Sequence, residues 1–172
     1  GELGGLLDYR SSVLQPTINS LGRVAIGLAD TFNDQHKAGM DLNNTLGGDF
    51  FSFEQPRTIP HSANTGSYPA GITTTITDVS QLTIDDYNLS FTGGNWQLVS
   101  TAGNMSSAAN LTADVPNVGD TTLSFEGLTV VIDAASVPQN GDKFSIKPTE
   151  QGSRTINLAI SDPSAIAAAA PI

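Results

Sequence analysis

The spacing of apolar residues changes near Gly47-Gly48, and this change constrains the fold of the 172-residue chain more than any other feature. Before it, apolar residues recur in steps of three and four, which places them along one side of a helix. After it, they alternate with polar residues, which is typical of strands with one buried face. The sequence therefore predicts an α+β protein, with a helical rod segment at residues 1–50 and a β domain at residues 51–172.

The amphipathic helix of the first part contains a proline. Pro16 lacks an amide hydrogen, and its ring would clash with the carbonyl four residues earlier. We therefore expect either two helical pieces that meet near Gln15 or one kinked helix. A leucine at every seventh position also favours packing against partner helices over packing in the core of the same chain. The apolar side of this helix comprises Leu7, Leu14, Leu21 and Leu28, together with Ile18, Ala25 and Phe32.

The second part consists of short alternating runs that end at turn-forming residues. Gly93-Gly94 lies between two such runs and predicts a tight hairpin, because hairpin turns need positive φ. Gly127 predicts a turn or a bulge, and residues 138–141 predict another turn. Short runs of this kind, rich in threonine and β-branched residues, predict a mainly antiparallel β-sandwich or a partly open barrel. The alternating positions are Ile72, Thr74, Ile76, Tyr87, Leu89, Phe91, Trp96, Leu98, Leu123, Phe125, Leu128, Val130, Ile132, Phe144, Ile146, Ile156, Leu158 and Ile160.

Two segments at opposite ends of the β region are alike. Residues 76–82 and 160–166 both run from a strand into an aspartate followed two residues later by a serine. We expect the side chains of Asp78 and Asp162 to accept backbone amide hydrogens of the next turn. Either the two strands lie near each other, as in a domain inserted into a longer chain, or the match is a coincidence of common turn chemistry.

The composition excludes several classes of protein. Seven Lys and Arg against seventeen Asp and Glu give a net charge of -10, which opposes binding to nucleic acid or to an anionic membrane. No apolar run approaches the roughly 20 residues that span a bilayer. The absence of cysteine excludes disulfides, thiolate metal sites and cysteine nucleophiles. The start at Gly1-Glu2-Leu3 is not a signal peptide, so either processing removed a leader or the chain is an internal fragment, and the alanine-rich end favours a fragment.

Few residues of this chain are suited to catalysis. His36 and His61 have no partner at the spacing of a metal or catalytic motif, so both are expected to be structural. Asp85 and Asp86 are adjacent, which in a strand points them to opposite faces. We therefore predict no catalytic residues, no metal and no cofactor, and we do not expect an enzyme.

A cluster of aromatic residues leaves one alternative open. Trp96, Tyr87 and Phe91 on the predicted hairpin are either core residues or a platform on which sugars stack. The platform would make the chain an extracellular carbohydrate-binding or adhesin-like β module, and it requires Trp96 to be exposed.

The N-terminal stretch carries a more specific signal. Residues 1–10 (GELGGLLDYR), 21–33 (LGRVAIGLADTFN) and 35–43 (QHKAGMDLN) resemble the helical region of the flagellar hook-associated protein family, FlgK. The similarity continues through residues 47–51, 82–90, 146–149 and 160–169. The helical motif is the most specific part, whereas the β region matches more in pattern than in identity.

The resemblance implies a structural role at the junction between flagellar hook and filament. It implies export through the flagellar type III channel, an extracellular location in the flagellum, and no enzymatic activity. The implied partners are other copies of the protein, the hook protein and the next junction protein. Leu7, Leu14, Ile18, Leu21, Leu28 and Phe32 would pack within the rod, and the β domain would face outward. Because the terminal helices of the family are missing here, the fragment is expected to be monomeric.

Overall fold

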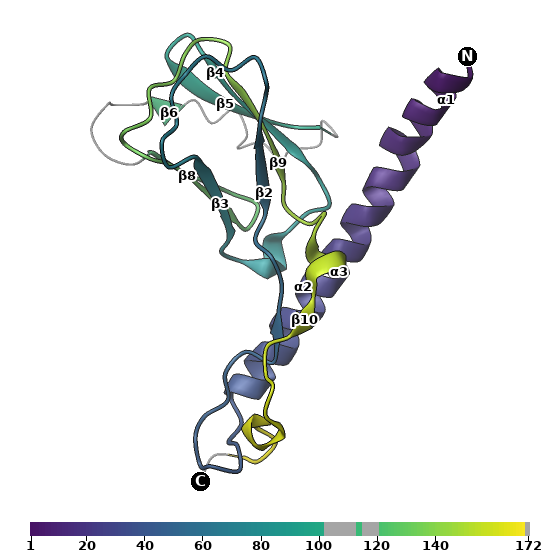
Figure 1. The fold of residues 1–172 in the computed structure, drawn as a ribbon, viewed down its shortest axis with the longest axis vertical. Coiled ribbons are helices and arrows are strands. Elements are labelled where there is room, and N and C mark those ends of the chain that lie inside the picture. Colours follow the sequence, from purple (N-terminus) through teal and green to yellow (C-terminus); the bar gives the residue numbers. More distant parts are fainter. Residues whose placement is uncertain (102–112, 115–120, 171–172) are drawn as a thin grey trace. The chain divides into compact units, whose positions relative to one another are not determined.

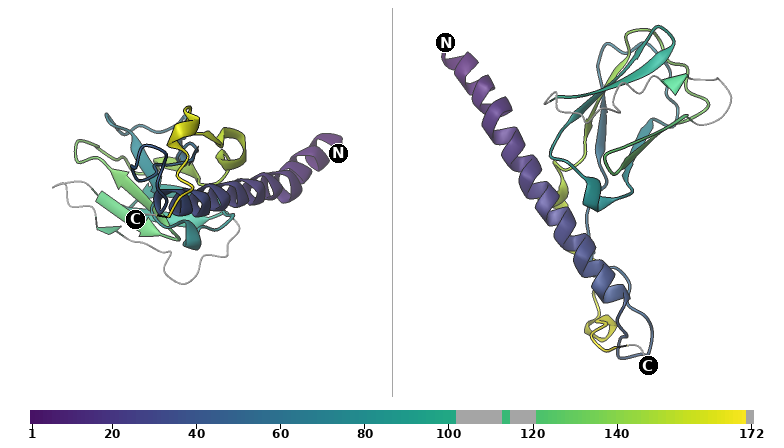
Figure 2. Two further views of the ribbon diagram at one scale, coloured as in Figure 1. Left: turned by 90° about the horizontal axis from the view of Figure 1, so that it is seen from below. Right: turned by 180° about the vertical axis from the view of Figure 1, so that it is seen from behind.

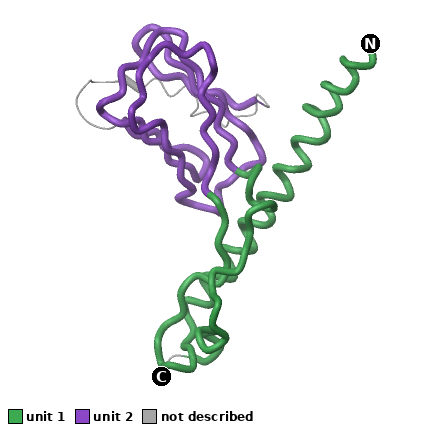
Figure 3. The backbone as a smooth tube through the Cα atoms, in the orientation of Figure 1, with its two compact units in different colours: residues 1–54, 149–172 green, residues 55–148 purple. Residues whose placement is uncertain are grey.

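The computed structural model describes residues 1–101, 113–114 and 121–170. The chain forms two compact units (Figure 3): unit 1 comprises Gly1–Glu54 and Thr149–Ile172, and unit 2 comprises Gln55–Pro148. Unit 2 is therefore inserted in sequence between the two segments of unit 1. This division differs from the predicted one, because the segment after residue 148 groups with the helix and not with the β strands.

One continuous helix opens unit 1 (Figures 1 and 2). It consists of α1 (Glu2–Tyr9), a π-helical turn (Arg10–Leu14) and α2 (Gln15–Lys37). The residues at both junctions keep right-handed helical dihedral angles, so the chain does not break into two pieces at the proline. Instead, the Gln15 amide donates to the carbonyl of Arg10, five residues earlier. The helix thus widens locally where Pro16 cannot supply an α-helical hydrogen bond.

The C-terminal segment of unit 1 returns along this helix. It contains α3 (Gly152–Thr155), β10 (Asn157–Leu158) and a 3-10 turn (Pro163–Ala165). Strand β10 pairs antiparallel with β1 (Phe51–Ser52). These two strands form a two-stranded sheet of their own. The predicted last strand, with apolar positions from 156 to 160, is therefore short and belongs to unit 1.

Unit 2 contains two antiparallel sheets. The larger sheet has the order β2-β9-β4-β5-β6, and the smaller has the order β3-β8-β7. In the described part of the chain neither sheet closes on itself, so the open antiparallel arrangement that the alternation predicts is confirmed and a closed barrel is absent. The strands are β2 (Arg57–Pro60), β3 (Ile72–Ile76), β4 (Tyr87–Thr92), β5 (Asn95–Ser100), β6 (Ala113–Asp114), β7 (Thr121–Phe125), β8 (Leu128–Ile132) and β9 (Lys143–Lys147).

The core of unit 2 lies between the two sheets. Alternate residues of β4, β5, β8 and β9 are buried. Tyr87 of β4 lies 5.0 Å from Phe125 of β7 between ring centroids, across the two sheets. Trp96 is fully buried and packs on Phe91, with ring centroids 5.1 Å apart. The single tryptophan therefore belongs to the core, which contradicts the sugar-stacking alternative.

The turns follow the local chemistry of the sequence. Gly93 and Gly94 both have positive φ in the β4–β5 hairpin, and Gly127 has positive φ in the β7–β8 hairpin. The carboxylates of Asp78 and Asp162 accept the amides two residues later, at 2.9 and 2.8 Å. The two turns are alike in structure as well as in sequence. They lie in different units, however, and the strands before them pair with different partners.

A buried carboxylate fixes the loops at one end of unit 2. Asp142 is 1% exposed and accepts hydrogen bonds from the Tyr68 hydroxyl at 2.6 Å and from the amides of Thr65 and Gln139 at 2.9 Å each. Burial by itself raises the pKa of Asp142, but these donors, foremost the Tyr68 hydroxyl, hold it below its ordinary value. Burial and the same carboxylate raise the pKa of Tyr68. The hydrogen bonds therefore favour the charged form of the aspartate.

Unit 2 should consequently lose stability in acid. Because the pKa of Asp142 is depressed in the folded state, its stabilisation is present above about pH 4 and is lost as the pH falls through the folded value. We expect Asp142→Asn to lower the free energy of unfolding at neutral pH by about 2–4 kcal/mol and to flatten its dependence on pH. Urea unfolding followed by Trp96 fluorescence measures both effects. Asp133→Asn, which keeps the single bond from the Ala135 amide, is the control and should be nearly neutral.

In unit 1, substitution of two helical glycines should have opposite effects on stability. A Cβ atom at Gly22 would lie 1.7 Å from the Thr149 carbonyl oxygen, whereas one at Gly27 would meet nothing within 4 Å. We expect Gly22→Ala to destabilise unit 1 by about 1–3 kcal/mol through overpacking, and Gly27→Ala to stabilise it by roughly 0.5–1 kcal/mol. Thermal unfolding followed by the helical circular dichroism signal compares the two. Equal stability of both variants would contradict the close packing at Gly22.

Candidate functional site on the long helix

The long helix has one side that its own chain covers. Its buried residues are separated by alternating steps of three and four, so they lie in one line along α2. We call this line the buried seam. It comprises Asn19, Gly22, Ile26, Ala29, Asn33 and His36.

Glycines bring the C-terminal segment close to this seam. The hypothetical Cβ at Gly22 would collide with the carbonyl of Thr149, and one at Gly152 would lie 2.5 Å from the carbonyl of Gly22. Ile26 is fully buried, and its side-chain carbons would lie 2.8 and 2.9 Å from that second Cβ. The backbone of the C-terminal segment therefore lies directly on the helix.

Asn33 attaches the segment that follows the helix. Its Oδ1 accepts the amides of Phe50 and Phe51 at 2.9 and 2.8 Å, and its Nδ2 donates to the Phe51 carbonyl at 2.9 Å. The side-chain amide thus makes the bonds that a neighbouring strand would make. This explains how a polar residue is stable in a buried position of the helix.

His36 joins the two sequence segments of unit 1. The ring is 4% exposed; Nδ1 lies 2.8 Å from the Gly48 carbonyl, and Nε2 lies 2.9 Å from the Ala167 amide. A carbonyl only accepts and an amide only donates, so we assign the neutral ring with its proton on Nδ1. Both ring nitrogens are used, and His36 is a structural residue as the sequence predicts.

Outside the buried seam of α2, the helix exposes large apolar side chains. No residue of α1 or of the π turn is buried. Among their leucines, Leu3 is 72% exposed and Leu6 is 64% exposed. Val24 of α2 is 69% exposed. We call this the exposed apolar side; it comprises Leu3, Leu6, Leu7, Tyr9, Val13, Leu14, Leu21, Val24, Leu28 and Phe32. Large exposed apolar surfaces mark sites of interaction.

The residues predicted to pack in the rod lie almost entirely on this surface. Leu7, Leu21 and Leu28 are each 58% exposed. Leu14 and Phe32 are also exposed, and Ile18 is half-buried. None of them belongs to the core of this chain. Their packing against partner helices stays a prediction.

Phe32 lies where the exposed side meets packed residues. Its ring centroid is 4.7 Å from that of Phe50 and 5.3 Å from that of Phe51. Around it the surface has a shallow, open hollow of about 600 Å³, which Leu28, Thr31, Phe32, Asp34 and Gln35 line. The hollow offers an apolar floor with a polar rim.

Sequence reasoning missed the buried seam, although the seam has the same spacing as the leucines. Its members include asparagine, glycine and histidine, which a search for hydrophobic residues passes over. Gly22 was the available signal, because a glycine inside a helix costs about 1 kcal/mol relative to alanine. A buried helical glycine usually marks a close approach of backbone.

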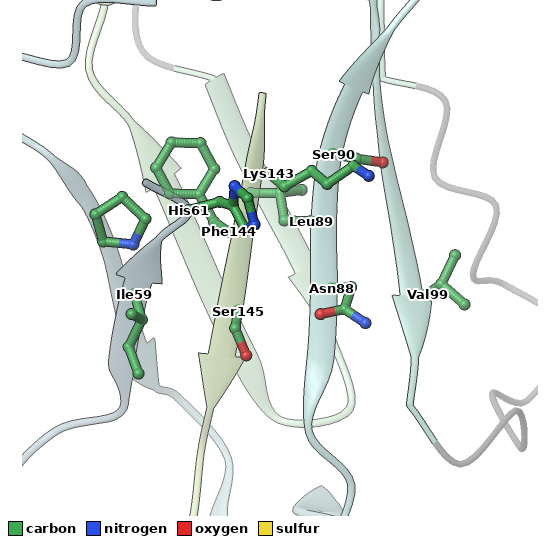
Figure 4. A pocket seen from close by; sticks show the side chains of 10 residues that line it. Ile59, His61, Asn88, Leu89, Ser90, Val99, Lys143, Phe144 and Ser145 are labelled. Atoms are coloured by element: carbon green, nitrogen blue, oxygen red, sulfur yellow. The ribbon is translucent and has the colours of Figure 1, made fainter. Parts of the chain in front are cut away.

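The second hollow lies on unit 2, around His61 (Figure 4). It has a volume of about 390 Å³ and is bounded by β2, β4, β5 and β9. His61 itself accepts the Ala63 amide at 3.2 Å, which makes it part of a local turn. Of the described residues that line this hollow, none is Asp or Glu, so His61 has no carboxylate pair beside it.

The remaining candidates for chemistry are also held by structural contacts. Asp85 accepts the Ser100 hydroxyl at 2.6 Å, and Asp86 lies 3.9 Å from the Lys147 ammonium. Within residues 1–101, 113–114 and 121–170 no group of three or more His, Asp or Glu side chains is placed to hold a metal ion. In the same residues, no helix combines the length and apolar character that crossing a membrane requires.

Two family models match the chain in separate segments. The model described as the flagellar hook-associated protein FlgK helical domain matches residues 1–51. The model described as the D2-like domain of flagellar hook-associated protein 1 matches residues 59–148, which is more than half of the chain. The first match lies in unit 1 and the second in unit 2.

Curated and solved relatives agree with these matches. Flagellar hook-associated protein 1 of Escherichia coli (strain K12) is 34% identical over 98% of this chain and 29% of its own length. The Salmonella typhimurium protein of that name is 33% identical over the same shares. The structure of the flagellar hook junction protein FlgK from Burkholderia pseudomallei matches with a TM-score of 0.81 and 34% identity, over 98% of this chain and 29% of its own.

The chain thus spans 29% of the length of the relatives that it matches. Both of its compact units are represented in the family models. The chain belongs to the flagellar hook-associated protein FlgK family.

Proposed function

We propose that this chain is part of a structural subunit at the junction between flagellar hook and filament, and that the exposed apolar side of its helix packs there against partner helices. The observation that carries the proposal is this surface, on a helix whose other side is already covered by its own chain. Membership of the flagellar hook-associated protein family supports a role at a flagellar junction.

The energetics support packing of the helix. Burial of a leucine is worth about 1.5–3 kcal/mol, and several leucines of α1 and of α2 are more than half exposed in this chain. A helical segment without tertiary contacts is marginal in water. Residues 2–14 contain no buried residue, so partner helices would supply the missing contacts.

The proposed partners are other copies of the protein, the hook protein and the next junction protein. Export through the flagellar type III channel, an extracellular location and the lack of a catalytic role are part of the same proposal. Relatives named as flagellar hook-associated and hook junction proteins support it. The absence of cysteine suits a subunit that passes unfolded through a narrow channel. Unit 2 would then serve as a spacer or exposed surface of the subunit.

Substitution on the exposed side tests the proposal. In the full-length protein, we expect Leu21→Ser together with Leu28→Ser to change the free energy of unfolding by less than about 0.5 kcal/mol per site, because both side chains are exposed. The same change should sharply reduce the fraction of cells that carry filaments, counted by electron microscopy. Leu42→Ser is the matched control, because Leu42 is 81% exposed but lies after the helix. Normal filament numbers in the double variant would refute the role of this side.

The isolated 172-residue chain makes a separate prediction. Its partner helices would lie in the rest of the protein, since the chain spans 29% of its relatives, and its net charge of -10 makes copies repel one another. We therefore expect a monomer in static light scattering at physiological salt. Growth of long tubes would show that residues 1–172 suffice for assembly.

A further inference from the structure

The π turn changes which residues share a side of the helix. The amide of Gln15 donates to the carbonyl of Arg10, five residues back instead of four. Such a turn holds about one residue more than an α-helical turn. Residues 2–9 are therefore rotated by about 100° relative to their positions in an uninterrupted α-helix, the rotation of one residue.

This rotation decides what lies in line with the buried seam. The seam continues from Asn19 to Gln15, whose Nε2 donates to the Asn19 Oδ1 at 3.0 Å. In an uninterrupted α-helix the same spacing would continue through Ser12 to Asp8 and Gly5, a charged residue and a glycine. With the extra residue it reaches Leu7 and Gly4.

The exposed apolar side is changed in the same way. The heptad spacing of Leu28, Leu21 and Leu14 would continue to Leu7 in an uninterrupted helix. With the extra residue it continues to Leu6 instead. The adjacent leucines, 64% and 58% exposed, are therefore in line with different residues of α2: Leu6 with the heptad leucines and Leu7 with the buried seam. The leucine spacing from residue 7 to residue 28 is thus offset by one residue at the π turn.

Local chemistry explains why the extra residue sits here. Pro16 cannot donate to the Ser12 carbonyl, which removes the α-helical bond at this point. The Ser12 hydroxyl donates to the Asp8 carbonyl at 2.6 Å, and the Thr17 hydroxyl donates to the Val13 carbonyl at 2.7 Å. Hydroxyls that bond back to carbonyls in this way take up acceptors and bend helices. Proline and its hydroxyl-bearing neighbours thus stabilise the π turn together.

We propose that Pro16 is a positioning residue for assembly: it sets the rotation of the first turns so that Leu7 and Gly4 prolong the buried seam for a helix of the same polypeptide. This inference rests on the proposed function, because it assigns a partner to the same helix. The chain spans 29% of its relatives, so most of the polypeptide lies outside these residues. Gly22 in the seam is filled by the Thr149 backbone, whereas Gly4 meets nothing within 4 Å and offers space for an equally close approach.

A pair of variants of the full-length protein tests whether the π turn sets the side of the helix on which Leu7 lies. Pro16→Ala restores the missing donor, so the helix can become α-helical throughout and turn Leu7 away from the seam. We expect retention of the purified protein on flagellar hooks to fall about tenfold or more, the effect of losing one buried leucine. Deleting Ser11 in addition removes the extra residue and returns Leu7 to its original side. Retention should then recover.

The controls distinguish the effect of rotating the first turns from the effect of a change in helix stability. Gly27→Ala stabilises the helix without rotating its first turns, so it should leave retention unchanged. Full retention in Pro16→Ala, or no recovery on deletion of Ser11, would overturn the inference. If Leu21→Ser with Leu28→Ser abolishes filaments while Pro16→Ala has no effect, the proposed function stands and only the role of Pro16 falls.

The occupant is tested by photo-crosslinking. A crosslinking amino acid at position 7 of the assembled full-length protein should give a product within one chain, identified by its mass and by peptide mapping. A product of twice the mass would show a second copy at this position and overturn the assignment to the same polypeptide. A product with the hook protein would overturn it as well.

Discussion

The contact of backbone with backbone at Gly22 is the constraint on which unit 1 depends. No side chain fits between the helix and the Thr149 carbonyl, so the returning segment lies closer than ordinary helix packing allows. Asn33 and His36 then hold the chain at two further points of the same line. Since these contacts occupy one side of the helix only, most large apolar side chains outside the seam are left to solvent or to a partner.

Unit 2 is stabilised by different means, which allows its fold to be independent of the helix. Trp96 and its aromatic neighbours fill the space between the two sheets, and burial of such rings dominates the energetics of a small core. Asp142 ties the β2–β3 loop to the β8–β9 loop by charge-assisted hydrogen bonds. Neither device uses a residue of unit 1. A separate core of this kind suits a module inserted into a rod without disturbing its packing.

Periodicity predicted the elements whose stability is local or follows from one buried face. The helix, the hairpin at Gly93-Gly94 and the alternating strands all follow from such patterns. The association of residues 149–172 with the helix was missed, because the close approach at Gly22 and a single polar side chain, His36, specify it, and neither residue belongs to a sequence repeat. For the leucines, the sequence pattern indicated only a preference for partner helices, and not how exposed each side chain is in this chain. A heptad count assumes one helix geometry throughout, so it cannot locate the extra residue of the π turn.

The two sides of the helix differ in the kind of partner that they accept. The seam needs a backbone that presents an amide or carbonyl at fixed points, as Asn33 and His36 require, and a partner helix has no such free groups along its length. The exposed leucines make contacts without direction, which any well-shaped apolar surface satisfies. A partner helix that slid onto the seam would leave buried polar groups unpaired, at a cost of about 1–3 kcal/mol each. Along α2 the polar seam thereby keeps partner helices on the leucine side, and discrimination comes from what the wrong side would leave unsatisfied.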